Sequence, residues 1–288
     1  MTDLLQRVGL EVAPLYQAAL EMVREAPDVH ADETSMRQQG LKTKAYVWTF
    51  TCPELTVYRY ATTRSGSVPV EVLGDSEGRL VVDAYTGCNK FTATGRRVRA
   101  GCLARARRGL FAQRETPGVE QALDLIAQIY QVERDAKQEG IVGSPAHLEL
   151  RRMRSRPLMA RLLCWARQQR RLHEPRSAMG KAVRYLTKNF RELDCFLRFA
   201  SIEPDNNKAE GALRRVAKGR SNFLFVGSEK AGHNLAVVYT LVASCEQHHV
   251  DPIAYLTDVL IRVQRHPASK VRDLLPHRWK PSTVRNRS

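Results

Sequence analysis

The chain has 288 residues, of which 43% are hydrophobic and 26% are charged. This length supports one large domain or two small ones with a real core, and the composition excludes a disordered chain. The formal net charge is +16 and the pI is about 9.9. Such an excess of Lys and Arg favours a polyanionic partner, usually nucleic acid, over a basic surface that only meets solvent.

The sequence has no signal for membrane insertion or export. No apolar run reaches membrane-spanning length, and the N-terminal segment lacks the apolar core of a signal peptide. The six cysteines, at 52, 88, 102, 164, 195 and 245, form no Cys-x-x-Cys pair and have no zinc-finger spacing. We therefore expect a cytoplasmic, nucleoid-associated protein with reduced, mostly buried thiols and no membrane partner.

The first hundred residues alternate between helical and strand patterns. Apolar residues at helical spacing predict a helix over 3–25, which Pro14 kinks or splits. A first strand is expected at 28–32. The β-branched and aromatic runs at 45–50 and 55–60 flank a turn, which predicts a hairpin. The remaining expected elements here are a short helix at 67–74, a strand at 79–83, a short helix from Tyr85 and a fifth strand at 97–102.

Helical periodicity dominates the next part of the chain, from Leu103 to about Leu197. Asp205 then reads as the N-cap of a further helix, which should run to Lys218 and stop at Gly219. The other expected elements are a very basic helix at 151–173, a helix at 177–190, a loop at 220–231 with a packed extended segment at 222–225, helices near 233–248 and 252–264, and a frayed basic tail after Pro276.

Three acidic residues from separate segments are candidates for a metal site. Asp32 and Asp83 are expected where two buried strands end, and Glu210 is expected in the second turn of its helix. Hard cations such as magnesium take oxygen ligands. The simpler alternatives are a helix cap at Asp32, a turn at Asp83, and a surface ion pair between Glu210 and Arg214. The residues alone leave both interpretations open.

Seven short motifs, in one order, extend over nearly the whole chain. They are His-Ala-Asp-Glu-Thr at 30–34, Asp-Ala-Tyr-Thr-Gly-Cys-Asn at 83–89, Ala-Gly-Cys-Leu-Ala-Arg-Ala-Arg-Arg at 100–108, Asp-Asn-Asn-Lys-Ala-Glu at 205–210, Asn-Phe-Leu-Phe-Val-Gly-Ser at 222–228, Asp-Pro-Ile-Ala-Tyr-Leu at 251–256 and Leu-Leu-Pro-His-Arg-Trp at 274–279. No single motif is decisive. As an ordered set they resemble the catalytic part of a bacterial DDE transposase of the insertion-sequence-66 family.

The resemblance implies an α/β fold of the ribonuclease-H-like class, with a mixed sheet flanked by helices. In that fold the first Asp lies on the first strand, the second just after the fourth, and the Glu on a later helix. Asp83 and Glu210 are 127 positions apart, which is too far for one connection, so a large all-helical insertion should precede the Glu helix. The expected parts are a core at 1–111, the insertion at 112–198, the rest of the core at 199–265 and a tail at 266–288.

The resemblance further implies that Asp32, Asp83 and Glu210 are catalytic and hold two Mg²⁺ or Mn²⁺ ions. The implied activity is metal-dependent DNA cleavage at transposon ends and joining of the 3′-hydroxyl to target DNA, as in-line displacements at phosphorus. The expected partners are transposon-end and target DNA, further copies of the chain assembled on DNA, and other transposition proteins of the same element.

Basic and amide side chains near these motifs are candidate DNA contacts. Phosphate contacts of this kind position the backbone without reading sequence, and a solvated basic face is the alternative. Asn206 and Asn207 would orient the metal site or contact DNA, with plain helix capping about equally favoured. The basic candidates are Arg105, Arg107, Arg108, Arg214, Arg215, Lys218 and Arg220.

The sequence departs from the family pattern in three places. Gly211 stands where an Arg usually follows the catalytic Glu, and Arg105 stands where the family has a His. Full-length relatives also carry an N-terminal extension with DNA-end-binding and zinc-binding parts, whereas this chain begins almost at the catalytic part. Two alternative functions therefore stay open. One is a truncated, inactive remnant that binds DNA non-specifically through its basic surface, and the other is a ribonuclease-H-like nuclease without strand transfer.

Overall fold

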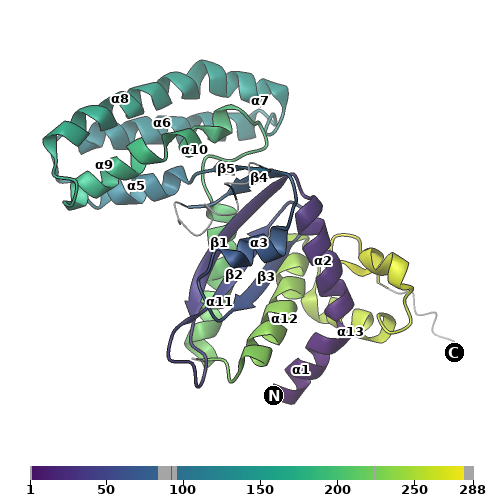
Figure 1. The fold of residues 1–288 in the computed structure, drawn as a ribbon. Coiled ribbons are helices and arrows are strands. Elements are labelled where there is room, and N and C mark those ends of the chain that lie inside the picture. The colour runs from purple at the N-terminus through teal and green to yellow at the C-terminus, as the bar shows by residue number, and fades with distance from the viewer. Residues whose placement is uncertain (1, 84–91, 93–95, 224, 282–288) are drawn as a thin grey trace. The chain divides into compact units, whose positions relative to one another are not determined.

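The computed structural model describes residues 2–83, 92, 96–223 and 225–281 (Figure 1). The chain divides into two compact units. The sheet unit comprises residues 1–78, 86–97 and 208–288, and the helical unit comprises 79–85 and 98–207. The predicted short helix from Tyr85 lies outside the described residues, as do Cys88 and the end of the tail from residue 282 onward.

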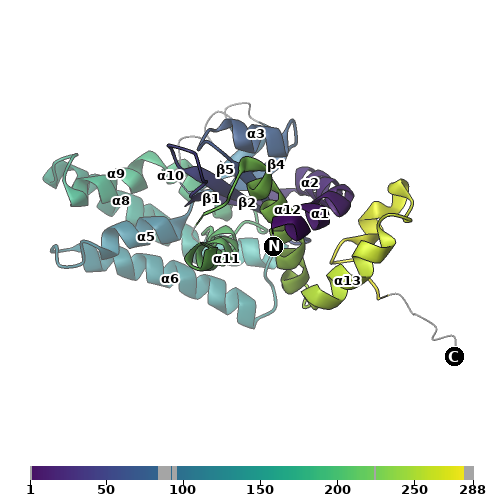
Figure 2. The same ribbon diagram turned by 90° about the horizontal axis from the view of Figure 1, so that it is seen from below.

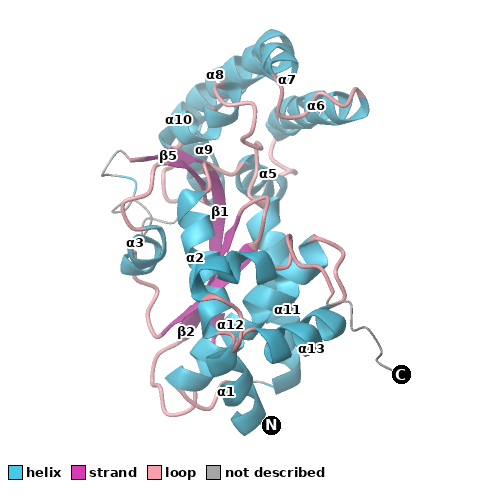
Figure 3. Ribbon diagram, turned by 90° about the vertical axis from the view of Figure 1, so that its right-hand side faces the viewer, coloured by secondary structure: helices cyan, strands magenta, loops and turns pink. Residues whose placement is uncertain are grey.

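Five strands form one sheet in the order β3-β2-β1-β4-β5, drawn in magenta in Figure 3. The strands are β1 (Asp28–Met36), β2 (Ala45–Thr51), β3 (Thr56–Ala61), β4 (Gly78–Val81) and β5 (Arg97–Ala100). The first three pair antiparallel, with Asp32 opposite Thr49 and Thr49 opposite Tyr58. The predicted α/β class and the predicted hairpin at 45–60 are confirmed.

Helices of the sheet unit precede, interrupt and follow its strands. They are α1 (Thr2–Glu11), α2 (Ala13–Glu25), α3 (Ser67–Leu73), α11 (Asn207–Phe223), α12 (Glu229–Gln247), α13 (Pro252–Arg262) and the 3₁₀ turn Ala268–Leu274. The predicted N-terminal helix is split at Val12, because Pro14 sits in the first turn of α2, where a missing N–H costs nothing. Helix α12 packs beside α1 (Figure 2).

Helix α12 also closes the outer edge of the sheet at β3. The backbone N–H of Tyr58 donates to Thr240 Oγ1 at 2.9 Å, and that of Thr56 donates to Ser244 Oγ at 3.2 Å. These hydroxyls satisfy edge-strand donors that a neighbouring strand would otherwise take. The close approach needs a glycine, because a Cβ at Gly232 would lie 2.6 Å from ring carbons of Tyr60.

Helices α11 and α12 cover one face of the sheet and enclose a hydrophobic core with it. The sheet contributes Met36, Val47, Tyr58 and Tyr60 to this core, and the helices contribute Leu213, Val216 and Ala236. On the strands these residues alternate along one face, as a half-buried antiparallel sheet requires. This shared core fixes α11 over the strand that carries Asp32.

The predicted end of α11 is wrong. The helix continues past Gly219 to Phe223 because Arg220 ties its last turn to β1, donating to Thr34 Oγ1 at 3.2 Å and to the Ser35 carbonyl at 2.5 Å. The predicted packed extended segment at 222–225 is also wrong: its first two residues are helical, Leu224 lies outside the described residues, and the Phe225 side chain is 48% exposed.

The described part of the helical unit between residues 103 and 197 consists of helices and their connections, as predicted. They are α5 (Leu103–Phe111), α6 (Val119–Gln138), α7 (Pro145–Leu150), a π-helical turn (Arg151–Ser155), α8 (Arg156–Leu172), α9 (Ala178–Lys188), α10 (Phe190–Leu193) and a 3₁₀ turn (Cys195–Leu197). Their apolar sides share a core that includes Leu103, Ile126, Ile129, Leu162 and Val183. The extent of the predicted insertion, 112–198, stays a prediction.

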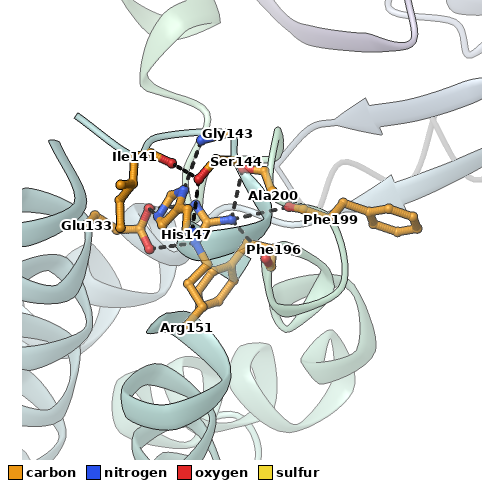
Figure 4. Close-up of polar contacts among 9 residues, drawn as sticks. All are labelled: Glu133, Ile141, Gly143, Ser144, His147, Arg151, Phe196, Phe199 and Ala200. Carbon is orange, nitrogen blue, oxygen red and sulfur yellow. Dashed lines mark hydrogen bonds and ion pairs between the residues drawn. The ribbon is translucent and has the colours of Figure 1, made fainter. Parts of the chain in front are cut away.

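A buried polar network lies inside the helical unit (Figure 4). The Arg151 side chain is 1% exposed and donates two hydrogen bonds to the Glu133 carboxylate, at 2.8 and 2.5 Å. Its remaining nitrogen donates to the carbonyls of Phe196, Phe199 and Ala200 at 2.9 to 3.3 Å. Arg151, the first residue of the predicted basic helix, is therefore a structural residue rather than a surface charge.

His147 completes this network. Its Nδ1 accepts a hydrogen bond from the Gly143 N–H at 3.2 Å, so the proton of the neutral ring lies on Nε2, which is 3.3 Å from Glu133 Oε2. Burial, and then the charge of Arg151, lower the pKa of His147 below its ordinary value. The ring is therefore neutral near pH 7.

Two further expectations concern the membrane and the thiols. Among the described residues, no helix combines the length and the apolar character needed to cross a bilayer. The five described cysteines are free thiols, and Cys164 is the exposed one among them. The prediction of mostly buried thiols is confirmed for this part of the chain.

Candidate active site

Asp32 lies in the middle of β1 rather than at its end. The strand continues from Asp32 through polar residues to Met36, so neither the predicted strand end nor the alternative of a helix cap is correct. The side chain is half-buried, and its Oδ1 accepts a hydrogen bond from the Glu33 N–H at 2.9 Å. Glu33 points to the other face of the sheet, as strand alternation requires, and its carboxylate pairs with Arg64.

The Asp32 side chain faces helix α11. Asp32 is aligned through β2 with Tyr58, so the two side chains share one face of the sheet. The Tyr58 hydroxyl donates to the Ala212 carbonyl of α11 at 2.7 Å. Two residues beyond Asp32 on the same face, Thr34 receives the hydrogen bond from Arg220 of α11. These contacts fix the face on which the Asp32 carboxylate lies.

Glu210 lies near the start of α11, on one flank of the helix. The buried residues Ala209 and Leu213 mark the side that meets the sheet. At about 100° per residue, Glu210 lies roughly a quarter-turn from that side. Arg215 lies on the opposite flank, where it pairs with Glu246 of α12. Glu210 is half-buried, and the helix that carries it covers the same face of the sheet as Asp32.

Asp83 follows β4 and belongs to the helical unit. Its side chain is 22% exposed, and its Oδ2 lies 3.5 Å from Nη1 of Arg105. Its main-chain carbonyl accepts a hydrogen bond from Arg99 Nη2 at 2.7 Å. Arg105, which the sequence suggested as a phosphate contact and which replaces a family His, thus provides the Asp83 carboxylate with an opposite charge.

Oxygen ligands from three carboxylates match the chemistry of a hard divalent cation. Asp32 and Glu210 belong to the sheet unit, and Asp83 belongs to the helical unit. Within the described residues, no group of three or more His, Cys, Asp or Glu side chains stands ready to hold a metal. The two-metal site at Asp32, Asp83 and Glu210 stays a prediction.

The segment before α11 is buried in the helical unit. Asp205 is 6% exposed, and its carboxylate accepts from the backbone N–H of Asn207 at 3.0 Å and from the Asn207 side chain at 2.8 Å. Asn206 is completely buried, and its N–H donates to Cys102 Sγ at 3.3 Å. The Asp205 carboxylate thus accepts the first N–H of α11, although the helix begins at Asn207 and not directly after Asp205. The roles predicted for Asn206 and Asn207 stay predictions.

The seven basic candidates have different environments. Arg220 is half-buried against β1, Arg215 is paired with Glu246, and Arg105 with Asp83. Arg107 lies over the Phe111 ring, 5.6 Å from its centroid. Arg108 is exposed. Arg214 and Lys218 are exposed on α11, and neither forms an ion pair within the part of the chain that the structure describes. Their predicted DNA contacts stay predictions.

Comparison with known proteins gives two family matches. Residues 1–234 match the family described as "Transposase IS66 family", and residues 240–277 match the "IS66 C-terminal element". Together these matches cover most of the chain, and the first alone covers more than half of it. No solved structure matches the chain.

Curated relatives match over nearly the whole chain. The chain is 27% identical to the uncharacterized protein y4hP of Sinorhizobium fredii, over 98% of this chain and 57% of that protein. It is 29% identical to y4qI of the same organism, over 99% of this chain and 57% of that protein. It is 29% identical to y4jD, over 96% and 58%. The chain thus spans about 57% of the length of these relatives.

Proposed function

The chain belongs to the IS66 transposase family, and from this premise we propose that it is the catalytic part of a DDE transposase that cleaves DNA at transposon ends and joins them to target DNA. The observation that carries the proposal is the position of two carboxylates. Asp32 on β1 and Glu210 on α11 lie on the same side of the sheet, in a unit whose core holds that strand and that helix together. The net charge of +16 supports a DNA substrate.

The proposed fold is ribonuclease-H-like. Three antiparallel strands followed by two further strands, with Asp32 on the first strand and Glu210 on a later helix, agree with the order that this fold implies. The position of Asp83, two residues after β4 ends, agrees as well. The long helical stretch between Asp83 and Glu210 would be the proposed insertion.

In the proposed mechanism, Asp32, Asp83 and Glu210 hold two Mg²⁺ or Mn²⁺ ions. When bound, two such ions stabilise the attacking and the leaving oxygens of an in-line displacement at phosphorus. The carboxylates orient this site, and exposed cations of the chain hold the phosphodiester backbone beside it. Arg105 lies beside one oxygen of the Asp83 carboxylate and would compete with a metal ion for its charge.

The test is cleavage of labelled transposon-end DNA in Mn²⁺ by the full chain and its Asp32→Asn and Glu210→Gln variants. We expect both variants to lose at least 10³-fold in cleavage rate, about 4 kcal/mol in activation free energy, and to bind DNA normally in EDTA. Asp124→Asn, which changes an exposed carboxylate of α6, is the matched control and should cleave normally.

Two outcomes would reject the proposal. If the unmodified chain binds DNA but never cleaves it in Mn²⁺ or Mg²⁺, the inactive-remnant alternative holds. If Asp32→Asn cleaves at the normal rate, Asp32 is not a catalytic residue. A chain that cuts DNA but does not join the 3′-hydroxyl to a target would instead be a ribonuclease-H-like nuclease.

A further inference from the structure

A basic groove lies in the sheet unit, along helix α11. Its volume is about 680 Å³, and its walls are α11, the C-terminal part of α12 and the turn between β2 and β3. The residues that determine its chemistry are Lys208, Gly211, Arg214, Arg215, Lys218 and Glu246. All of them belong to one compact unit, so the groove needs no contribution from the other.

The groove is strongly positive. Four cations and one carboxylate line it, which leaves three net positive charges. Glu246 is already paired with Arg215, whose Nη1 donates to it at 2.6 Å. Arg214 and Lys218 are exposed, and within the described residues no carboxylate pairs with either. Like charges gathered in one hollow repel each other, and an anion in the hollow relieves this repulsion.

The cations follow one stripe along the helix. Lys208, Arg215 and Lys218 are seven and three residues apart, and Gly211 lies between the first two on the same stripe. From 208 to 218 the helix rises roughly 15 Å. Phosphates of one DNA strand advance about 3.4 Å per nucleotide along the duplex axis. The stripe is therefore long enough to contact more than one phosphate of a strand rather than a single anion.

The floor of the groove offers no platform on which bases could stack. Among the described residues that line it, Tyr58 is the single aromatic side chain. Tyr58 is completely buried, and its hydroxyl is occupied by the Ala212 carbonyl. Sequence-tolerant binding of unpaired bases uses exposed aromatic platforms, which this floor lacks. Contacts here would therefore go to the sugar-phosphate backbone and would be independent of sequence.

Gly211 keeps the middle of the stripe open. A Cβ at this position would have no heavy atom within 4 Å, so the absence of a side chain leaves solvent-filled space between Lys208 and Arg214. A backbone phosphate could approach the helix there. A Cβ at this position also meets no clash, so substitutions of Gly211 are suitable as tests.

We propose that this groove binds the phosphodiester backbone of one DNA strand over more than one phosphate, without reading its sequence. The identification of the ligand as DNA rests on the proposed function. Helix α11 would then carry both the phosphate track and Glu210, so that it positions the backbone relative to the carboxylates.

The first test is DNA binding by fluorescence anisotropy in EDTA, with a labelled duplex and increasing salt. Arg214→Glu combined with Lys218→Glu should weaken binding at least tenfold and reduce the slope of log K against log salt by about 1.8, because two phosphate contacts are lost. The matched control is Arg265→Glu with Lys270→Glu, which makes the same charge change at exposed positions of the same unit. Equal losses in both double variants would overturn the proposal.

A second pair of variants tests the groove in case the double variant does not fold. Gly211→Arg should tighten binding and steepen the salt slope by about 0.9, and Gly211→Glu should do the opposite, with helix content unchanged by circular dichroism. An unchanged DNA affinity in both variants would contradict the proposal that the groove binds DNA.

If the double variant Arg214→Glu with Lys218→Glu binds DNA normally but no longer binds poly-L-glutamate, the ligand is an acidic protein segment and the proposal fails. Because DNA binding is measured without metal, failure of the groove proposal can be distinguished from failure of the proposed cleavage activity.

Discussion

Arg151 of the helical unit and Arg214 of α11 have the same chemistry and different environments. Arg151 is buried, and every nitrogen of its guanidinium has a protein acceptor. Arg214 is exposed beside a basic groove. In the sequence both residues belong to basic helical stretches. The difference shows that a count of positive charges predicts a polyanion-binding surface only when buried, paired cations are left out of the count.

The contrast also has an energetic side. Removing one partner of a buried ion pair leaves an uncompensated charge and costs about 3–5 kcal/mol. Changing an exposed residue away from such networks costs less than about 0.5 kcal/mol. Substitutions in the buried network of the helical unit should therefore act on stability, and substitutions in the groove should act on binding.

The largest expected effect is at Arg151. Arg151→Met should reduce the free energy of unfolding by about 3–5 kcal/mol, because Glu133 and three main-chain carbonyls lose their donor in a buried site. The measurement is urea denaturation followed by circular dichroism. Arg152→Met is the matched control, because the Arg152 side chain is exposed and its ion pair with Glu149, at 3.6 Å, lies on the surface. Equal midpoints for the two variants would show that the buried network is not stabilising.

Two glycines in helices give the next effect, with opposite signs. Gly232→Ala should destabilise the fold by about 1–3 kcal/mol, because the new methyl group would overlap the Tyr60 ring. Gly211→Ala should stabilise it by up to about 1 kcal/mol, because alanine favours the helix and meets no neighbour. Urea midpoints measure both. A stabilised Gly232→Ala variant would mean that α12 can move away from β3 at little cost.

The smallest effect is a pH dependence from His147. Its pKa in the folded state is lowered relative to the unfolded value near 6.5, so the unfolded chain takes up a proton first as the solution is acidified. Stability from this residue is complete above pH 6.5 and falls as the pH decreases toward the folded pKa, by at most about 1.4 kcal/mol per pH unit. His147→Gln should flatten this slope between pH 7.5 and 5 in urea titrations. An identical slope in the variant would assign the acid sensitivity to other groups.

Local patterns predicted most elements of the sheet unit correctly. The Pro14 break, the hairpin of β2 and β3 and the helix at α3 depend on residues that are near one another in sequence. The sequence predicts that the first strand ends at Asp32, before a run of polar residues that extends to Ser35. The strand continues because partners distant in sequence satisfy these residues, Arg64 on Glu33 and Arg220 on Thr34 and Ser35.

The candidate site shows the same limit. The sequence identified Asp32 and Glu210 by motif, but their common face follows from the register of three strands and from the Tyr58 contact with α11. The stop predicted at Gly219 failed because a tertiary anchor one residue later outweighed the local preference of glycine. No sequence signal distinguishes Arg151 from its exposed neighbours, since its partner Glu133 lies on another helix.

The hydroxyls of α12 that hold the β3 edge have a consequence for self-assembly. An uncovered edge strand invites a foreign strand to extend the sheet, which is the usual start of domain swapping and fibrous aggregation. Thr240 and Ser244 occupy the outward N–H groups of Tyr58 and Thr56, so this edge offers no template to an incoming chain. Both hydroxyls belong to the segment that matches the C-terminal element, so this segment covers the edge strand of the sheet.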